Sequence, residues 1–285
     1  MLGFLNIYKP TGITSNAVVQ RIKKHFHINK IGHMGTLDPM AQGVLPIAIG
    51  KATRLFDYSL NKTKRYIAIF DFGYTTDTLD TTGLETDRHE IDIDEGLLRE
   101  KCQLLIGDIN QIPPLYSAKN VDGRRAYDLA RAGVEFELKP KLITIHKLAL
   151  LEKVGKNRFK FDITCSSGTY IRAIARDLAK LCDTFGCMSY LERVETGEFN
   201  LDNATNLDSL LECNRLDEFL LSPLDVFKNF DKFNINEKNF NDLLNGKEIK
   251  IKPFEKDTFI IYNNKLVGVA VPHINKIKLN TFLYE

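Results

Sequence analysis

The order of apolar and polar residues predicts short strands and helices that mix without a regular repeat. Residues 2–8, 44–49 and 66–72 are apolar runs with the length and composition of β-strands. Residues 143–154 and 158–165 are two further strand candidates, and the short polar turn between them predicts a hairpin. The strands expected in the first two-thirds of the chain are thus spread along it.

Helical periodicity appears between these strands. Residues 15–26 should form a helix with Ser15 as its N-cap, and residues 169–182 carry apolar side chains at helical spacing. Residues 95–105 also fit a helix, whereas the acidic residues 77–95 include few large apolar side chains and predict an exposed loop. Because strands and helices do not alternate as βαβ units, we expect an α+β fold with a largely antiparallel mixed sheet.

The character of the sequence changes near residue 222. Residues 1–222 contain enough apolar positions for one large domain, and residues 223–285 are richer in Asn and Lys. Short strands are expected at residues 259–262 and 266–271, so the second segment predicts a small β-rich domain.

Two absences suggest a location. No apolar run approaches the roughly 20 residues that a membrane-spanning helix needs, so no membrane association is expected. The N-terminal residues also lack the pattern of a signal peptide. The default expectation is a cytoplasmic protein.

A net charge of +2 conceals a strong segregation of charge. Residues 1–65 carry ten Lys and Arg against Asp38 and Asp57, a net charge of +8. Residues 66–115 carry a net charge of −8, and residues 116–195 return to +5. This segregation fits a polyanion that meets one side of the molecule, or simply a set of ordinary solvated faces, and charge alone does not separate the two.

The sequence contains no pattern for a bound cofactor or metal. It has no GxxxxGK[ST], GxGxxG or HExxH motif, so no nucleotide cofactor and no metal ion is expected. The odd number and scattered spacing of the cysteines indicate buried, reduced thiols rather than disulfides or a zinc site. They are Cys102, Cys165, Cys182, Cys187 and Cys213.

One carboxylate lies in an unusual loop. Asp38 precedes Pro39 within residues 32–46, which hold three glycines and two prolines, and a chain punctuated in this way has a fixed backbone shape. A carboxylate so placed can act as a covalent nucleophile if it stays ionised and points at an electrophilic carbon. It can equally form an Asx turn, and the residue types alone favour the turn.

Three further residues could be either functional or structural. Arg172 falls in the first turn of a predicted helix, where the dipole disfavours a cation, so it needs a carboxylate or a phosphate unless it simply faces solvent. Tyr66 follows Lys64 and Arg65, a composition that suits base stacking beside a phosphate, or half-buried core. His33 either contacts a substrate or hydrogen-bonds the backbone.

Together these segments resemble a known family. Residues 32–54, GHMGTLDPMAQGVLPIAIGKATR, closely resemble the signature of the TruB family of tRNA pseudouridine synthases. The likeness covers about residues 3–200, apart from a few departures such as Asn120 and Arg54 at positions where lysine is usual. Further blocks match in the same order: residues 6–10 with 14–15, 64–66, 113–118, 168–172 and 190–193.

The resemblance implies a fold and a set of site residues. The fold would be the pseudouridine-synthase α+β fold, with a small RNA-binding PUA-like domain at residues 223–285. By position, Asp38 matches the catalytic aspartate and Arg172 the arginine paired with it. The residues matched to the target base are Tyr66, which stacks on it, His33, which helps to flip it, and Leu191, which lines its pocket.

The resemblance also implies an activity. The family converts uridine 55 of the tRNA T-loop into pseudouridine, an isomerisation that needs no cofactor. The expected partner is the T-arm of tRNA, bound by a monomer without an obligate protein partner. Alternatives are a tRNA-folding chaperone whose catalysis is secondary or lost, and a pseudouridine synthase for another RNA. Phosphate contacts are expected from Lys64, Arg65, Lys119, Arg176 and Lys180.

Overall fold

The fold is built on one large mixed sheet. The structure is a computed structural model, and it describes residues 1–59, 63–117, 119–121, 123–249, 255–271 and 279–284. Among these residues ten strands form the large sheet, in the order β14-β1-β3-β12-β4-β11-β10-β7, with β2 paired to β3 and β13 to β12. Their bounds are β1 Gly3–Lys9, β2 Ile31–His33, β3 Gln42–Ile49, β4 Lys64–Phe72, β7 Gly107–Gln111, β10 Lys141–Gly155, β11 Arg158–Cys165, β12 Gly186–Thr196, β13 Phe199–Asn200 and β14 Thr205–Asn206.

The predicted fold class is confirmed. Most neighbouring strands are antiparallel, and the parallel pairs in the large sheet are β1 with β14 and β3 with β12. The strands predicted in the first two-thirds of the chain all form, and so does the predicted β10–β11 hairpin. Strand β12, which lies between β3 and β4 at the centre of the sheet, was not predicted.

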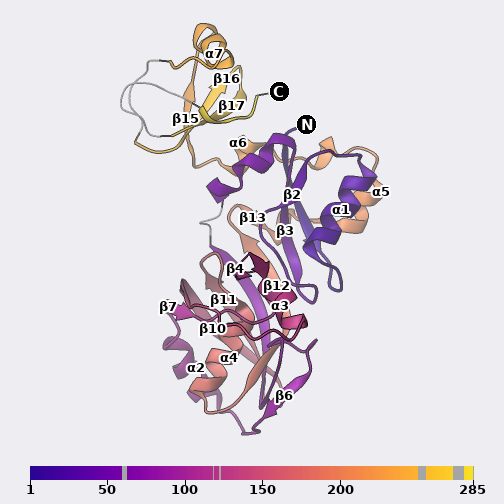
Figure 1. Ribbon diagram of the computed structural model, residues 1–285, viewed down its shortest axis with the longest axis vertical. Coiled ribbons are helices and arrows are strands. Elements are labelled where there is room, and N and C mark those ends of the chain that lie inside the picture. The colour runs from indigo at the N-terminus through magenta and orange to yellow at the C-terminus, as the bar shows by residue number, and fades with distance from the viewer. Residues whose placement is uncertain (60–62, 118, 122, 250–254, 272–278, 285) are drawn as a thin grey trace.

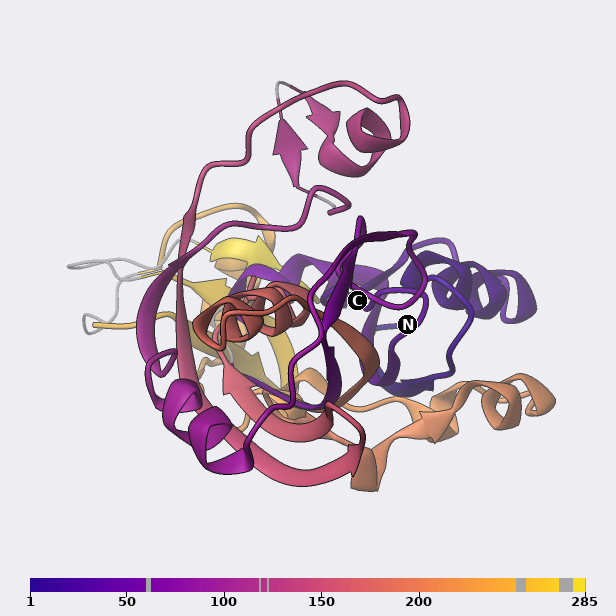
Figure 2. The same ribbon diagram turned by 90° about the horizontal axis from the view of Figure 1, so that it is seen from below.

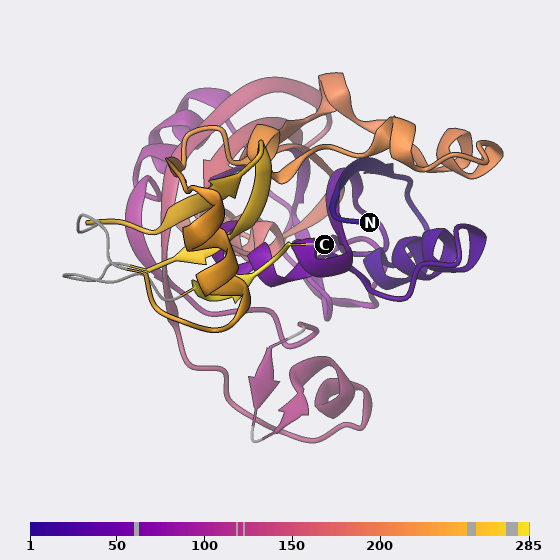
Figure 3. The ribbon, with the colours of Figure 1, turned by 90° about the horizontal axis from the view of Figure 1, so that it is seen from above.

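Helices cover the sheet and its edges. Helices α4 and α2 contribute Ile174, Leu178 and Leu98 to the main core, where they meet Phe70 of β4 and Phe161 of β11. Helices α1 and α5 lie side by side at one edge (Figures 1 and 3). The helix bounds are α1 Ser15–His25, α2 Glu95–Gln103, α3 Ala126–Arg131, α4 Ile171–Leu181, α5 Leu207–Glu212, α6 Pro223–Val226 and α7 Glu237–Leu244, and the 3-10 turns are Gly50–Leu55, Asp57–Ser59, Leu201–Asn203 and Asp217–Phe219.

The N-cap prediction for α1 was wrong by one residue. The helix is capped by Thr14, whose side chain accepts a hydrogen bond from the Ala17 backbone at 3.0 Å. Ser15 is the first helical residue, and its buried hydroxyl bonds to Leu37 instead. Both residue types are common N-caps, and the tertiary contact of Ser15 to Leu37 leaves the cap to Thr14.

A second, smaller sheet holds the C-terminal strands. Its order is β15 Asp231–Asn234, β16 Thr258–Tyr262, β17 Lys265–Ala270 and β18 Leu279–Phe282, and it lies beyond α6 in Figure 1. A shared apolar cluster joins it to the large sheet, because Phe227 contacts both Phe4 of β1 and Phe259 of β16 with ring centroids 5.7 Å apart in each pair. The domain boundary at residues 222 and 223 stays a prediction.

Two small hairpins form sheets of their own. One pairs β5 Tyr74–Thr76 with β6 Glu85–Arg88. The other pairs β8 Asn120–Val121 with β9 Arg124–Arg125 and leads into α3, and Figure 2 shows this segment projecting away from the sheet. None of the described helices is long and apolar enough to cross a membrane.

Candidate active site

The loop that carries Asp38 is fixed on both sides of that residue. The Ser15 hydroxyl donates to the Leu37 carbonyl at 3.0 Å and accepts from the Leu37 amide at 2.8 Å. The Pro39 carbonyl accepts from the Gly12 amide at 2.8 Å. The backbone is therefore held at the residues before and after Asp38, whose own side chain is 35% exposed.

A buried arginine ties the two ends of the same loop together. Arg193 of β12 is fully buried, and its guanidinium donates to the carbonyls of Val44 at 2.8 Å, Gly35 at 3.2 Å and Thr36 at 3.4 Å. Gly43 allows the backbone of Arg193 to pass close to the loop, because a Cβ there would lie 2.3 Å from the Arg193 carbonyl oxygen. Arg193 thus fixes the shape of the loop from residue 35 to residue 44.

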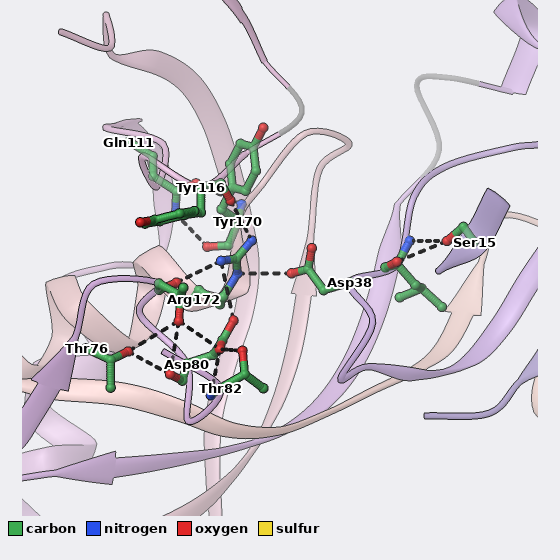
Figure 4. Close-up of polar contacts among 11 residues, drawn as sticks. Ser15, Asp38, Thr76, Asp80, Thr82, Gln111, Tyr116, Tyr170 and Arg172 are labelled. Carbon is green, nitrogen blue, oxygen red and sulfur yellow. Dashed lines mark hydrogen bonds and ion pairs between the residues drawn. The ribbon is translucent and has the colours of Figure 1, made fainter. Parts of the chain in front are cut away.

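Arg172 connects Asp38 to two other segments (Figure 4). Its Nε lies 3.0 Å from Asp38 Oδ2, and its Nη1 lies 3.4 Å from Asp80 Oδ2. Nη1 also donates to the Thr78 carbonyl at 2.7 Å, and Nη2 to the Tyr116 carbonyl at 3.1 Å. The acceptors offset the unfavourable position of this cation in the first turn of α4. A carboxylate partner for Arg172, one of the options that the sequence left open, is therefore observed.

Asp80 was not expected at the site. Its side chain is only 6% exposed, although the acidic segment around it was predicted to be an exposed loop. Asp80 Oδ1 accepts from the hydroxyls of Thr78 at 2.9 Å and Thr82 at 2.5 Å, and from the Thr82 amide at 3.0 Å. These bonds fix the orientation of the carboxylate. The threonines on both sides of Asp80 were the one signal for it in the sequence.

The residues expected to contact a base lie around the same loop. Tyr66 of β4 faces the core opposite Arg193 of β12, and burial raises the pKa of its phenol to about 12. Leu191 lies two residues earlier on β12 and is also buried. His33 ends β2, and burial together with nearby Arg193 lowers its pKa, which favours a neutral imidazole. Its Nδ1 has no hydrogen-bond partner among the described residues.

The five predicted phosphate contacts do not gather in one place. Lys64 lies near the Asp38 loop, since a Cβ on Gly35 would stand 3.5 Å from its Nζ. Arg65 points to the other face of β4 and pairs with Asp162 through bonds of 2.9 and 3.0 Å. The others are spread over the surface: Lys119 donates to the Lys139 carbonyl, Arg176 donates to the Ile112 carbonyl, and Lys180 is exposed at the end of α4.

A metal centre has no support in the described part of the chain. No group of three His, Cys, Asp or Glu side chains there is arranged to hold a metal ion. Arg172 occupies the space between Asp38 and Asp80, so these two carboxylates face a guanidinium. The arrangement suits one ionised carboxylate that is aimed by a cation and placed near a buried aromatic ring.

Comparison with known proteins gives this arrangement a family. The model of the TruB family pseudouridylate synthase N-terminal domain matches residues 23–171. The tRNA pseudouridine synthase B of Caldanaerobacter subterraneus subsp. tengcongensis is 36% identical over 97% of both chains. That of Alkaliphilus oremlandii is 38% identical over 100% of this chain and 99% of its own. This chain belongs to the TruB family.

Solved structures resemble the fold of nearly the whole of this chain. A chain in a Cbf5-Nop10-Gar1 complex matches with a TM-score of 0.74 and 22% identity, over 99% of this chain and 84% of its own. A chain in an H/ACA RNP bound to a substrate RNA containing 2′-deoxyuridine matches with the same TM-score and 20% identity, over 99% and 85%. The pseudouridine-synthase fold implied by the sequence is thereby confirmed.

Asp80 should be important for stability. Replacing it in Asp80→Asn removes one of the two carboxylates that face buried Arg172, so the free energy of unfolding should fall by about 2–4 kcal/mol in urea titrations. Asp87→Asn is a matched control, since Asp87 is exposed on the neighbouring strand β6, and should change stability by less than about 0.5 kcal/mol. Equal stability of the two variants would contradict this account of Asp80.

Proposed function

We propose that this chain is a tRNA pseudouridine synthase that converts uridine 55 of the T-loop into pseudouridine. The observation that carries the proposal is the Asp38–Arg172 ion pair in a loop whose backbone is fixed on both sides. Relatives named tRNA pseudouridine synthase B, at 36% and 38% identity over nearly the whole chain, support the same activity. A protein that only binds RNA would have no need to hold a carboxylate in this way.

The reaction requires mainly that the protein position the uridine and place a charged group beside it. The C1′–N1 bond of the uridine breaks, the uracil turns, C5 bonds to C1′, and the proton on C5 is released while N1 gains one. The product is an isomer of the substrate, so its formation needs no second substrate. Asp38 would either add to the sugar or the base, or remove a proton as a glycal forms. In both routes the guanidinium of Arg172, whose Nε lies 3.0 Å from Asp38 Oδ2, would hold the carboxylate in place.

The other site residues would handle the base. Flipping a uridine out of its loop costs a few kcal/mol of stacking. Tyr66 and Leu191 are buried neighbours of the Asp38 loop that can contact the flipped ring. His33 has an unsatisfied ring nitrogen in a partly buried position, which suits it to fill the vacated space or to contact the RNA. We expect the T-arm of tRNA as partner, a monomeric enzyme and a cytoplasmic location.

The most direct test is to map the product. Incubating the protein with a T-arm stem-loop should convert the uridine at the T-loop position, and no other uridine, to pseudouridine. The position can be mapped by chemical derivatisation that stops reverse transcription at pseudouridine. A stem-loop with cytidine at that position is the control. Pseudouridine elsewhere in the RNA, or none at all, would refute the proposed target.

Asp38→Asn should separate catalysis from binding. The amide keeps the shape of the side chain but is no nucleophile or base, so the single-turnover rate should drop at least about a thousandfold. The Kd for tRNA should stay within about threefold, because Asp38 makes no contact with phosphates in this account. Asp57→Asn, which removes the other acidic residue among residues 1–65, is the matched control and should turn over normally. An Asp38→Asn protein with the wild-type rate would exclude Asp38 as the reacting group.

A further inference from the structure

A cluster of hydrogen-bond donors lies beside the site and has no assigned ligand. The turn formed by Ser167 and Gly168 connects β11 to the residues just before α4. Two lysines reach it from different strands. Lys64 of β4 donates to the Ser167 hydroxyl at 3.3 Å, and a Cβ added to Gly168 would lie 2.2 Å from the Nζ of Lys141 in β10.

The cluster contains donors and no carboxylate. Neither Lys64 nor Lys141 forms an ion pair with any described residue. The backbone amides of Ser167, Gly168 and Thr169 likewise have no hydrogen bond to any described residue, and Gly168 has a positive φ of 85°. Successive free amides around a left-handed residue form a nest that suits an anion. These amides lead toward the N-terminus of the 11-residue helix α4, which adds to the positive potential there.

The positive charges of the cluster are not balanced within the protein. Burial and the nearby charges of Arg193 and Lys141 lower the pKa of Lys64 to about 8, whereas the Cys165 thiol next to it acts the other way. Two ammonium groups and a guanidinium that repel one another are stabilised when an anion enters between them. An unliganded enzyme keeps such an arrangement only at a cost, which an anionic ligand would offset.

The turn itself is rigid. The Ser166 hydroxyl accepts from the Thr144 amide at 2.9 Å, and the Ser166 amide donates to the Thr144 carbonyl at 2.8 Å. Gln111 bonds to both backbone groups of Tyr170, at 2.9 and 3.2 Å. The donors at residues 167–169 are therefore held in place before any ligand arrives, which reduces the entropy lost on binding.

The position of the cluster indicates which anion it takes. Lys64 lies two residues before Tyr66, Gly168 lies four residues before Arg172, and Gly35, which Lys64 approaches, lies three residues before Asp38. An anion bound here would thus be a near neighbour of the nucleotide at Asp38. A nucleotide that is flipped out must be held by its backbone, and phosphates are the groups that position it.

We propose that Lys64, Lys141, Ser167 and Gly168 form a binding site for one RNA phosphodiester next to the target nucleotide. The proposal rests on the proposed function for the identity of the RNA. It assigns Lys141 and the turn a part in binding, and it gives Lys64 a defined ligand. It also separates Lys64 from Arg65, which is paired with Asp162 on the other face of β4.

A coupling experiment tests the site. T-arm stem-loops carrying one uncharged methylphosphonate at a time are titrated against wild-type protein, Lys64→Met and Lys141→Met. At one phosphate beside the target uridine, the substitution should weaken wild-type binding about tenfold, but either variant by less than about twofold. At all other positions the loss should be the same for the three proteins. Equal losses at every position in all three would overturn the proposal.

Controls separate the possible failures. Lys156→Met removes an exposed lysine at the far end of the β10–β11 hairpin, about 50 Å from Lys141 along the strand, and should bind every RNA as the wild type does. Lys141 is exposed, so its variant gives a result even if Lys64→Met unfolds. A site that binds inorganic phosphate in the wild type but shows no coupling to any RNA phosphate would be an ion site and would overturn the proposal.

The same RNAs distinguish this inference from the proposed function. Pseudouridine formation by the wild type is measured on the unmodified stem-loop in parallel. Product without coupling at any phosphate would leave the proposed function standing and overturn the phosphate site. Coupling without product would support the phosphate site and refute the synthase activity.

Discussion

The guanidinium of Arg172 is the interaction on which the arrangement of the site depends. It contacts Asp38 from the loop after β2, Asp80 and Thr78 from the β5–β6 hairpin, and the Tyr116 carbonyl from the segment after β7. Three parts of the chain that are far apart in sequence therefore meet at one side chain of α4. Buried ion pairs contribute little net stability, because desolvation costs about as much as the attraction returns. Their value here is geometric, since a planar fork with several donors fixes the direction of the carboxylate.

A second constraint is an excess of buried positive charge around Asp38. Arg193 and Lys9 are fully buried, Lys64 is partly buried, and burial lowers the pKa of Lys9 to about 8. Lys9 and Arg193 donate mainly to backbone carbonyls of the Asp38 loop and its neighbours, so they shape the loop rather than pair with acids. A polyanionic substrate would complete this charge balance. In the proposed function, the same set of residues would both place Asp38 and attract the RNA.

Much of the large sheet, the helix α4 and the rigid loop around Asp38 could be predicted from the sequence. Strands such as β3 and β4 and the helix α4 form continuous apolar patterns, and the Gly and Pro residues around Asp38 mark a loop of fixed shape. Strand β12 was not predicted, because register shifts after Met188 and Arg193 interrupt the alternation of buried and exposed side chains along it. It also buries Arg193, a residue type that is not expected in a core. Asp80 and the bonds of Arg193 depend on contacts between distant segments, and no local pattern reports such contacts. Residue types also could not decide between Thr14 and Ser15 as the cap of α1.

We propose that the fork of Arg172, and not only its charge, places Asp38 for reaction. Single-turnover pseudouridine formation by Arg172→Lys tests it most directly, since lysine keeps the charge but can reach only part of the four acceptors. We expect a rate at least about a hundredfold below that of the wild type, with a Kd for tRNA within about threefold of the wild-type value. A variant that forms pseudouridine at close to the wild-type rate would contradict it.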